Sequence, residues 1–441
     1  MAKSKQPSIA VLKALTSEEA ADHLYAKNVE EKAAEYEQYE PYLWQQYIES
    51  KPDSYEEQQA ATALTKINLV KISAQFASPQ TSQLALNRDK WAARFTEISS
   101  EIYQPPESGV VRTVVKDQLD KLGASGYFTN KVRAFYEALD KRLEKMDLPD
   151  TPFLTLSADD RNALQAAFIE YHQDWFGNVG DEANGLYSPS DLVDLFNSLL
   201  HIRAKNDSRW KSWKAILDDD KSHVSVVANE QLISVGRLRV DASGQEVLGL
   251  VAHELGVHAT RFVNGSSCDK ALGEGYPGYL DIEESFGVLS EWLVIGDMPH
   301  KAYDRYIDIA LAMEVVPGVK LDRHELMQLA FERELGRQEA QQITIDDKVV
   351  VDAAKSAKSH VQRIFRGGDG REGEQAVFTK DAIYYPAKLE DYIVRQMSRG
   401  YSAPELIVFL LQGKFDPTDK RHLLWLEQAG VDTLSLPESA G

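Results

Sequence analysis

The segment GLVAHELGVHATRFVNG, residues 249–265, holds the side chains most able to do chemistry. His253 is followed directly by Glu254, and His258 stands five positions after His253. Histidine is the commonest protein ligand of zinc, and a neighbouring glutamate is the usual base in zinc peptidases. These residue types predict a metal site with hydrolytic chemistry. The alternative is two histidines on an ordinary helix, one packed and one exposed.

The spacing of the two histidines is unusual. At about 100° per residue, five positions on a regular α-helix place two imidazoles about 140° apart, too far around the helix to share one ion. A single π-turn brings them back onto one face, and such turns concentrate at functional sites. Gly256 lies inside this turn and is expected to ease the distortion. We therefore predict a π-type turn, or an equivalent break, between His253 and His258.

A third ligand is predicted in YLDIEESFGVLSEWL, residues 279–293. Catalytic zinc takes three protein ligands and keeps a fourth position for water. Glu283 and Glu284 stand at the start of an otherwise apolar helix, where a buried carboxylate is costly unless it meets a metal or a cation. The alternative is a solvated acidic N-terminus, which suits the helix dipole.

Together the two segments resemble the QEGLA-motif proteins, a family that includes the microtubule-associated tyrosine carboxypeptidases. The family's motifs are HE-x-G-x-H and, on a second helix, T/E-E/Q-E-G-L-A-V-L, which HELGVH and EESFGVLSE match in large part. Two more stretches are similar, FTEISSEIYQPP at residues 95–106 and FRGGDG…VFTKDAIYY at residues 365–385. The resemblance thus covers roughly residues 90–400 of the chain.

This resemblance implies a zincin-like core of the gluzincin type, with a small sheet before the metal-binding helix. It implies zinc held by His253, His258 and Glu284, with Glu254 as the catalytic base. Glu284 is preferred to Glu283 because it stands immediately before the position of the family's glycine. The chain has Ser-Phe-Gly where the family has Gly-Leu-Ala, which reshapes the wall beside the carboxylate more than the ligand set.

The expected activity is that of a zinc carboxypeptidase that removes a C-terminal residue, tyrosine or another aromatic, from a peptide or protein. Glu254 would activate a zinc-bound water, and a second electrophile would face the developing oxyanion. The candidates for that electrophile are Arg261, Lys380, Tyr384 and Tyr385.

A basic island supplies candidates for binding the substrate's free carboxylate. Residues 351–400 carry nine Lys/Arg and seven Asp/Glu, a net charge of +2, so the other 391 residues carry −22. A buried carboxylate needs a cation, and Arg can hold it through two parallel hydrogen bonds. The candidate anchors are Arg363, Arg366 and Lys380. Ordinary solvated surface charge is the alternative.

Helical periodicity dominates the chain and must position these residues. The only convincing strands lie between about residues 212 and 240, as WKAIL, HVSVVA and LISVGRLRV. A capping box at Thr16–Glu19 predicts a long helix that reaches about Ser50. The predicted class is therefore α+β and predominantly helical, with one small sheet before the metal-binding helix.

Two consecutive prolines near residue 105 mark the expected domain boundary. An N-terminal helical region, residues 1–105, precedes a metallopeptidase domain, residues 106–435. We expect the two to pack as one unit.

Composition excludes several classes of partner. The 441 residues include 49 basic and 69 acidic side chains, a net charge of −20. Such a surface repels polyanions, so we expect neither nucleic acid nor a membrane as partner, and the acidic tails of tubulin are a doubtful substrate. The single Cys268 excludes an internal disulfide, and no signal peptide or long apolar run is visible. A cytoplasmic location is expected.

Two other functions fit the same residues. A non-hydrolytic interaction protein could retain the fold, although a binding protein has no need of Glu254. An endopeptidase with an open cleft would have the same metal ligands but no anchor for a terminal carboxylate.

Overall fold

The computed structural model describes residues 7, 15, 29–77, 88–122, 126–146, 153–179, 185–366 and 376–431. Helices dominate these residues and the strands form two small sheets, which confirms the predicted α+β, mostly helical class. None of the described helices has both the length and the apolar composition needed to cross a membrane.

The chain folds into two compact units, each made of two stretches of sequence. Unit 1 comprises Met1–Phe153 and His300–Tyr385, and unit 2 comprises Leu154–Pro299 and Pro386–Gly441. The second stretch of unit 1, His300–Tyr385, therefore lies in the sequence between the two stretches of unit 2. None of these divisions coincides with the boundary predicted after residue 105, which stays a prediction.

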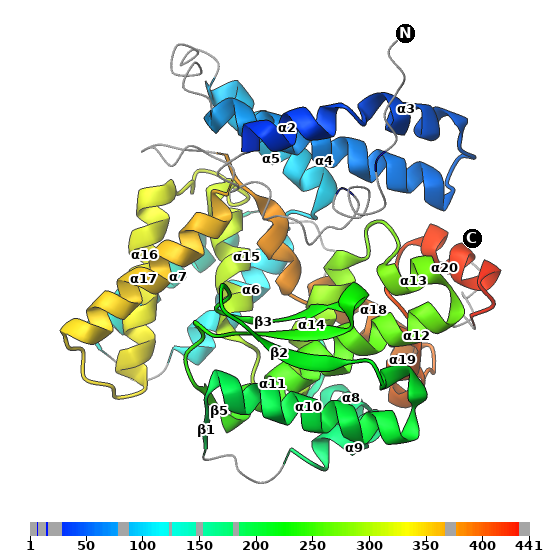
Figure 1. Ribbon diagram of the computed structural model, residues 1–441. Helices are drawn as coiled ribbons and strands as arrows, with labels where there is room; N and C mark the ends of the chain where they lie inside the picture. Colours follow the sequence, from blue (N-terminus) through cyan, green and yellow to red (C-terminus); the bar gives the residue numbers. More distant parts are fainter. Residues whose placement is uncertain are drawn as a thin grey trace. The chain divides into compact units, whose positions relative to one another are not determined.

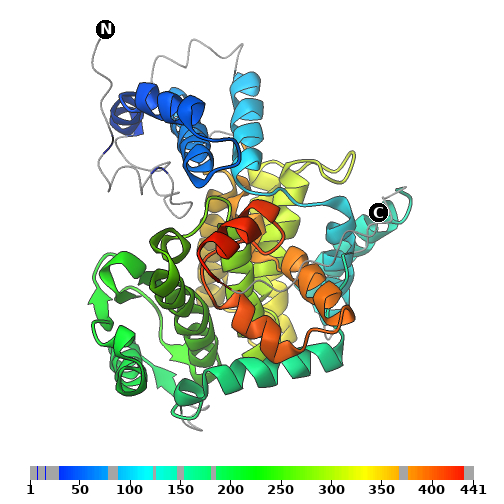
Figure 2. The ribbon, with the colours of Figure 1, turned by 90° about the vertical axis from the view of Figure 1, so that its right-hand side faces the viewer.

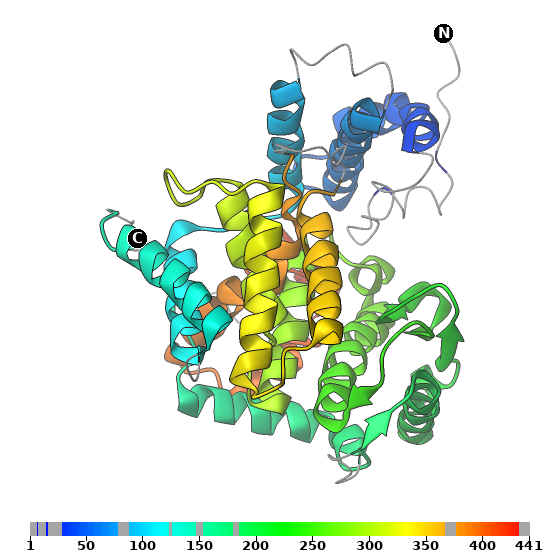
Figure 3. The ribbon, with the colours of Figure 1, turned by 90° about the vertical axis from the view of Figure 1, so that its left-hand side faces the viewer.

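Unit 1 is helical throughout its described residues. The α-helices α16 and α17 lie side by side (Figure 3), α7 packs against α16, and α15 contacts α6 and the 3₁₀ helix η6. On α17 the buried residues recur every three or four positions, so that one face is apolar. The elements are α2 (Val29–Glu37), α3 (Glu40–Glu49), α4 (Tyr55–Ala77), α5 (Arg88–Ile102), α6 (Ser108–Lys121), α7 (Tyr127–Leu143), α15 (His300–Ala312), α16 (Arg323–Ala340), α17 (Asp347–Ile364) and η6 (Thr379–Tyr384).

The helix predicted to reach Ser50 is interrupted. The chain leaves α2 after Glu37 and starts α3 at Glu40, with Pro41 in the first turn. Proline lacks a backbone N–H and fits a helix only near its start, so a continuous helix through Pro41 is disfavoured. The capping box predicted at Thr16–Glu19 lies outside the described residues.

Unit 2 contains both sheets, which lie in its first stretch of sequence. Its first stretch has α8 (Ala158–Tyr171), α9 (Gln173–Phe176), β1 (Leu186–Tyr187), α10 (Pro189–Asn206), η3 (Ser208–Trp210), β2 (Lys214–Asp218), β3 (Val224–Val227), η4 (Ala228–Glu230), β4 (Leu232–Gly236), β5 (Ala242–Ser243), α11 (Gly244–Leu250), the π-helix η5 (Val251–Ala259), α12 (Thr260–Cys268), α13 (Lys270–Glu274) and α14 (Leu280–Ile295). Its second stretch has α18 (Ala387–Ser398), α19 (Ala403–Leu410) and α20 (Lys420–Gln428).

The three predicted strands form one sheet in the order β2-β4-β3, with β2 parallel and β3 antiparallel to β4. The third strand was predicted to reach residue 240 but ends at Gly236, where the chain turns and a Cβ would lie 2.4 Å from the Lys221 carbonyl oxygen. A second sheet pairs the two-residue strands β1 and β5, which the sequence did not predict.

One apolar core joins the sheet to the helix that follows it. The helix α10 contacts β2 and β4, and η5 contacts β3 (Figure 1). The backbone stays helical from α11 through η5 into α12, since the junction residues Leu250, Val251, Ala259 and Thr260 all have right-handed helical dihedral angles. Ser243 caps the start of this long helix by accepting a hydrogen bond from the Glu246 N–H.

The helix α14 packs along η5 and α11, and the C-terminal helices complete unit 2. Figure 2 shows these C-terminal helices in orange to red; α18 contacts α14, and α19 contacts α8. Unit 2 thus brings residues after position 386 to the helices that carry the predicted metal ligands.

Candidate metal centre

The predicted π-turn is confirmed. Residues Val251–Ala259 form a π-helix, and the Thr260 hydroxyl donates to the Leu255 carbonyl oxygen at 2.8 Å. The wider turn places the imidazole rings of His253 and His258 on the same face, with their centroids 4.7 Å apart. The five-residue spacing is therefore compatible with a shared ion.

Gly256 lies inside the π-helix, and its predicted part in easing the turn stays a prediction. A Cβ at this position would lie 2.7 Å from the Phe168 ring on α8. Glycine lets the π-helix approach α8 closely. Phe168 in turn meets Phe286 of α14, with ring centroids 6.3 Å apart.

The three predicted ligands converge. One donor atom from each of His253, His258 and Glu284 lies within 4.8 Å of the others. Glu284 Oε2 is 3.8 Å from His253 Nε2 and 4.0 Å from His258 Nε2, and each side chain is 12% exposed. A zinc ion at tetrahedral angles sets such donors about 3.3–3.6 Å apart, so small side-chain rotations would suffice to bind it. The three donors could hold a metal ion, and two imidazoles with one carboxylate are ligand types that zinc accepts.

Each imidazole contacts a glutamate of α14 through its Nδ1 atom. His253 Nδ1 lies 2.5 Å from Glu291 Oε1, and His258 Nδ1 lies 2.8 Å from Glu283 Oε1. In metal sites the ring nitrogen that does not bind the ion commonly donates to a carboxylate, which fixes the tautomer and the ring orientation. Both Nε2 atoms are thereby left to face Glu284.

Glu283 lies outside the group of three donors and is paired with cations instead. It is fully buried, and Arg261 Nη1 donates to its Oε2 at 2.6 Å. Lys414 Nζ lies 3.4 Å from its Oε1. Although burial raises the pKa of Glu283, the charges of Lys414, Arg261 and His258 hold that pKa well below its ordinary value.

Arg261 does not present its guanidinium to a substrate. Its side chain is fully buried, and its other two nitrogens donate to backbone carbonyls, Nε to Gly413 at 2.6 Å and Nη2 to Phe415 at 2.8 Å. The candidate oxyanion group of the sequence analysis is therefore a structural cation behind Glu283.

Glu254 has the surroundings of a base. It is 7% exposed, and its carboxylate makes no hydrogen bond or ion pair with any side chain in the described part of the chain. Burial raises the pKa of Glu254, against the opposing charges of His253 and His258. A raised pKa suits a carboxylate that accepts and returns a proton near neutral pH.

Around the three donor atoms, the carboxylates outnumber the cationic side chains. Burial lowers the pKa of His253, but Glu284 and Glu291 raise it well above its ordinary value. With neutral imidazoles the groups sum to −2, which a divalent cation would neutralise. These groups are Glu254, Glu283, Glu284, Glu291, Arg261 and Lys414.

Gly287 makes room for the first histidine. A Cβ at this position would lie 2.6 Å from Cε1 and 2.7 Å from Nε2 of His253. Glycine at this position therefore leaves the space that the His253 imidazole occupies.

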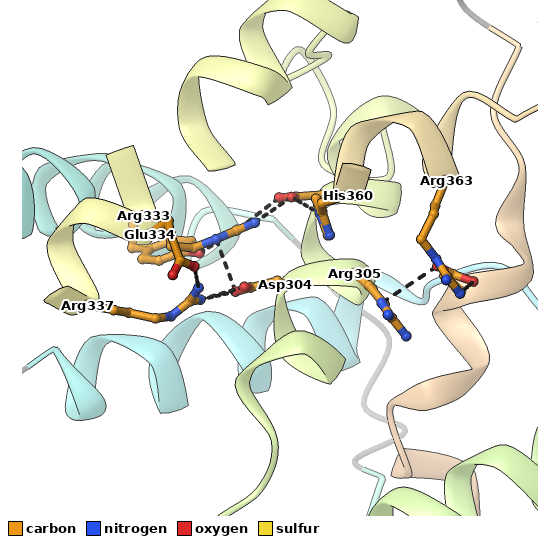
Figure 4. Close-up of polar contacts among 10 residues, drawn as sticks. Asp304, Arg305, Arg333, Glu334, Arg337, His360 and Arg363 are labelled. Atoms are coloured by element: carbon orange, nitrogen blue, oxygen red, sulfur yellow. Dashed lines mark hydrogen bonds and ion pairs between the residues drawn. The ribbon is translucent and has the colours of Figure 1, made fainter. Parts of the chain in front are cut away.

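The remaining predicted residues belong to unit 1, whereas the metal ligands belong to unit 2. Arg363 pairs with Asp381, with Nε–Oδ2 and Nη2–Oδ1 distances of 2.5 and 3.1 Å (Figure 4). Lys380 is 7% exposed, and its ammonium lies 5.5 Å from the centre of the Tyr384 ring. Arg366 is half-buried at the end of the described stretch.

Tyr384 and Tyr385 both pack within unit 1. The Arg305 guanidinium lies 4.6 Å from the centre of the Tyr384 ring, and Tyr385 contacts Tyr303 and Tyr306, with ring centroids 5.6 and 5.1 Å apart. The substrate-binding roles of these residues, like those of Arg363, Arg366 and Lys380, stay predictions.

Two supporting residues were missed from the sequence. Glu291 follows Glu284 by seven positions, two helical turns, which places both on one face of α14 and was a usable signal. Lys414 gave no local signal, because it reaches Glu283 from more than a hundred residues away.

No family model, curated protein or solved structure matches the chain. The candidate centre accordingly depends on the geometry and chemistry of its own residues.

Proposed function

We propose that the protein is a zinc-dependent peptidase, of the carboxypeptidase type, with its centre at His253, His258 and Glu284. The observation that carries this proposal is that one donor atom from each of two histidines on a π-turn and from Glu284 of α14 lie within 4.8 Å of one another, beside the buried Glu254. A small sheet, a metal helix and a second helix with the third ligand also correspond to the zincin-like core implied by the resemblance. A cytoplasmic location stays part of this proposal.

His253, His258 and Glu284 would hold the ion. Bound there, zinc would polarise a substrate carbonyl and lower the pKa of water to about 7. Glu254 accepts a proton from the attacking water and passes it to the amine nitrogen that leaves. Glu291 and Glu283 keep the two imidazoles oriented through Nδ1.

The carboxypeptidase form is favoured by the resemblance and by the basic island at residues 351–400. A free terminal carboxylate is an anion, and residues 351–400 carry a net charge of +2 in a chain whose net charge is −20. The peptide's end, and an aromatic last residue, would then be the recognised feature.

The test combines metal analysis with a peptide assay. The purified protein should contain about one zinc per chain and shorten peptides with free C-termini by one residue, as read by mass spectrometry. C-terminally amidated copies of the same peptides are the matched control and should be poor substrates. Cuts inside the peptides would indicate an endopeptidase, and zinc-loaded protein that cleaves none of them would favour a binding protein.

A further inference from the structure

A buried chain of polar contacts leads from a C-terminal loop to the second histidine. Arg261 Nη1 donates to Glu283 Oε2 at 2.6 Å, and Glu283 Oε1 lies 2.8 Å from His258 Nδ1. Arg261 and Glu283 are both fully buried. Glu283 Oε2 already accepts from Arg261, and Oε1 lies within hydrogen-bond distance of His258 Nδ1, so this geometry assigns the donated proton to Nδ1 and leaves the lone pair on Nε2.

The loop that follows α19 fixes Arg261 in turn. The carbonyl oxygens of Gly413 and Phe415 accept from its Nε and Nη2. The loop is itself anchored to the segment after α12, since Lys414 N donates to the Leu272 carbonyl oxygen at 2.9 Å and Tyr276 N donates to the Lys414 carbonyl oxygen at 3.0 Å. These backbone hydrogen bonds hold the loop in place, and the two loop carbonyls in turn fix the orientation of the Arg261 guanidinium.

We propose that Glu283 and Arg261 are positioning residues that set the tautomer and orientation of His258, and that the loop Gly413–Phe415 completes the metal centre. The centre is then assembled from both stretches of unit 2, on either side of the segment that belongs to unit 1. This inference rests on the proposed metal site and deepens it: the affinity for the ion depends on residues that never touch it.

The decisive variants change the carboxylate and keep its surroundings. Glu283→Asp retains the charge opposite Arg261 and Lys414 but withdraws the oxygens from His258 by one methylene. Glu283→Gln keeps the length and loses the charge. Both should lower zinc affinity about 10–100-fold, measured by competition with a chromogenic chelator. The visible spectrum of the cobalt-substituted protein should also change, because it reports ligand geometry and not overall stability.

Unit 1 supplies a matched control. Asp308 is also fully buried and accepts from an arginine and a histidine, Arg333 at 2.6 Å and His360 at 2.7 Å. Asp308→Asn removes a carboxylate of the same kind and should leave zinc affinity and the cobalt spectrum unchanged. Circular dichroism of the metal-free proteins checks that each variant is folded. If Glu283→Gln does not fold, the zinc affinity of Glu283→Asp decides the test.

Each outcome separates the two claims. Weaker zinc binding in folded Glu283→Asp, with unchanged binding in Asp308→Asn, supports the inference. Parental affinity and spectrum in Glu283→Asp overturn the inference and leave the metal site standing. An equal loss in Asp308→Asn shows general destabilisation and overturns it as well. A parent that binds no zinc overturns both the inference and the proposed function.

Discussion

Two Arg–carboxylate–His triads lie in different units of the molecule. In unit 1, Asp308 accepts from Arg333 Nη2 at 2.6 Å and from His360 Nε2 at 2.7 Å. In unit 2, Glu283 accepts from Arg261 Nη1 at 2.6 Å and lies 2.8 Å from His258 Nδ1. Burial raises the pKa of each carboxylate, but the neighbouring charges outweigh it and hold both pKa values below their ordinary range.

The triads differ in the charges beyond them. Asp304 joins the unit 1 triad and pairs with Arg333 at 3.1 Å and with Arg337 at 2.5 Å (Figure 4). Two buried aspartates therefore meet two arginines, so the charges of these four groups cancel, and the partly exposed Glu334 adds a third carboxylate 3.4 Å from Arg337. This triad braces α15 against α16 and α17.

The unit 2 triad adjoins a group of residues whose charges do not cancel. Beyond His258 lie three more carboxylates, Glu254, Glu284 and Glu291, and one more imidazole, His253. The same three residue types thus form a brace between helices in unit 1, and in unit 2 they support the imidazole that we propose as a metal ligand. The excess of buried carboxylates beside His258, which the triad of His360 lacks, is the difference on which that proposal depends.

The largest contrast between the triads should appear when each histidine is removed. His258→Ala should reduce bound zinc from about one equivalent per chain to none, because two donors do not hold the ion tightly. His360→Ala should retain the full equivalent. Elemental analysis of both purified variants measures this, and full zinc in His258→Ala would remove the ligand assignment.

The comparison also assigns the chemistry to unit 2 through Glu254. Glu254→Gln keeps the shape of the side chain but cannot accept the proton of water, so peptide turnover should fall about 10²–10⁴-fold with zinc content unchanged. Glu246→Gln, on the exposed start of the same long helix, is the control and should retain the parental rate. Parental turnover in Glu254→Gln would show that another group is the base.

The ion pairs of Asp308 in unit 1 should contribute to the free energy of unfolding and to its dependence on pH. Asp308→Asn leaves Arg333 partly unpaired and should lower the free energy of unfolding by about 3–5 kcal/mol at pH 7. Since the folded pKa of Asp308 is depressed, the unfolded state binds its proton first, and the parent loses this stability as the pH falls below about 4. The difference between parent and variant should therefore narrow in acid, as urea titrations at several pH values would measure. A constant difference would contradict the ion-pair account.

The smallest effect is steric. Gly287→Ala adds a methyl group 2.6 Å from Cε1 of His253 and should rotate that ring, lowering zinc affinity about 10-fold or more. Gly109→Ala in α6 is the control, because no atom lies within 4 Å of its added Cβ. Chelator competition compares the two, and equal affinities would show that the ring position tolerates the change.

Local spacing accounts for the parts of the site that the sequence predicted. The interval from His253 to His258 required a π-turn because of helix geometry alone. The acidic pair before an apolar helix pointed to a third carboxylate, and the resemblance favoured Glu284 over Glu283. The three central strands followed from β-branched runs between polar turns. The two-residue strands β1 and β5 are too short for such a pattern.

Tertiary contacts explain what the sequence did not predict. Arg261 looked like a substrate group because it follows the metal motif, but its partners Gly413 and Phe415 stand 152 and 154 residues later in the chain. No periodicity links positions so far apart. The assembly of unit 2 from two separated stretches has the same origin.

The central claim is that unit 2 binds a metal ion at three side chains, and X-ray diffraction at the zinc absorption edge tests it most directly. Crystals of the protein grown with zinc should give one anomalous peak bounded by Nε2 of His253, Nε2 of His258 and the Glu284 carboxylate, and none beside Asp308. A zinc-saturated crystal with no peak among these three donors, or with its only peak at another site, would contradict the account.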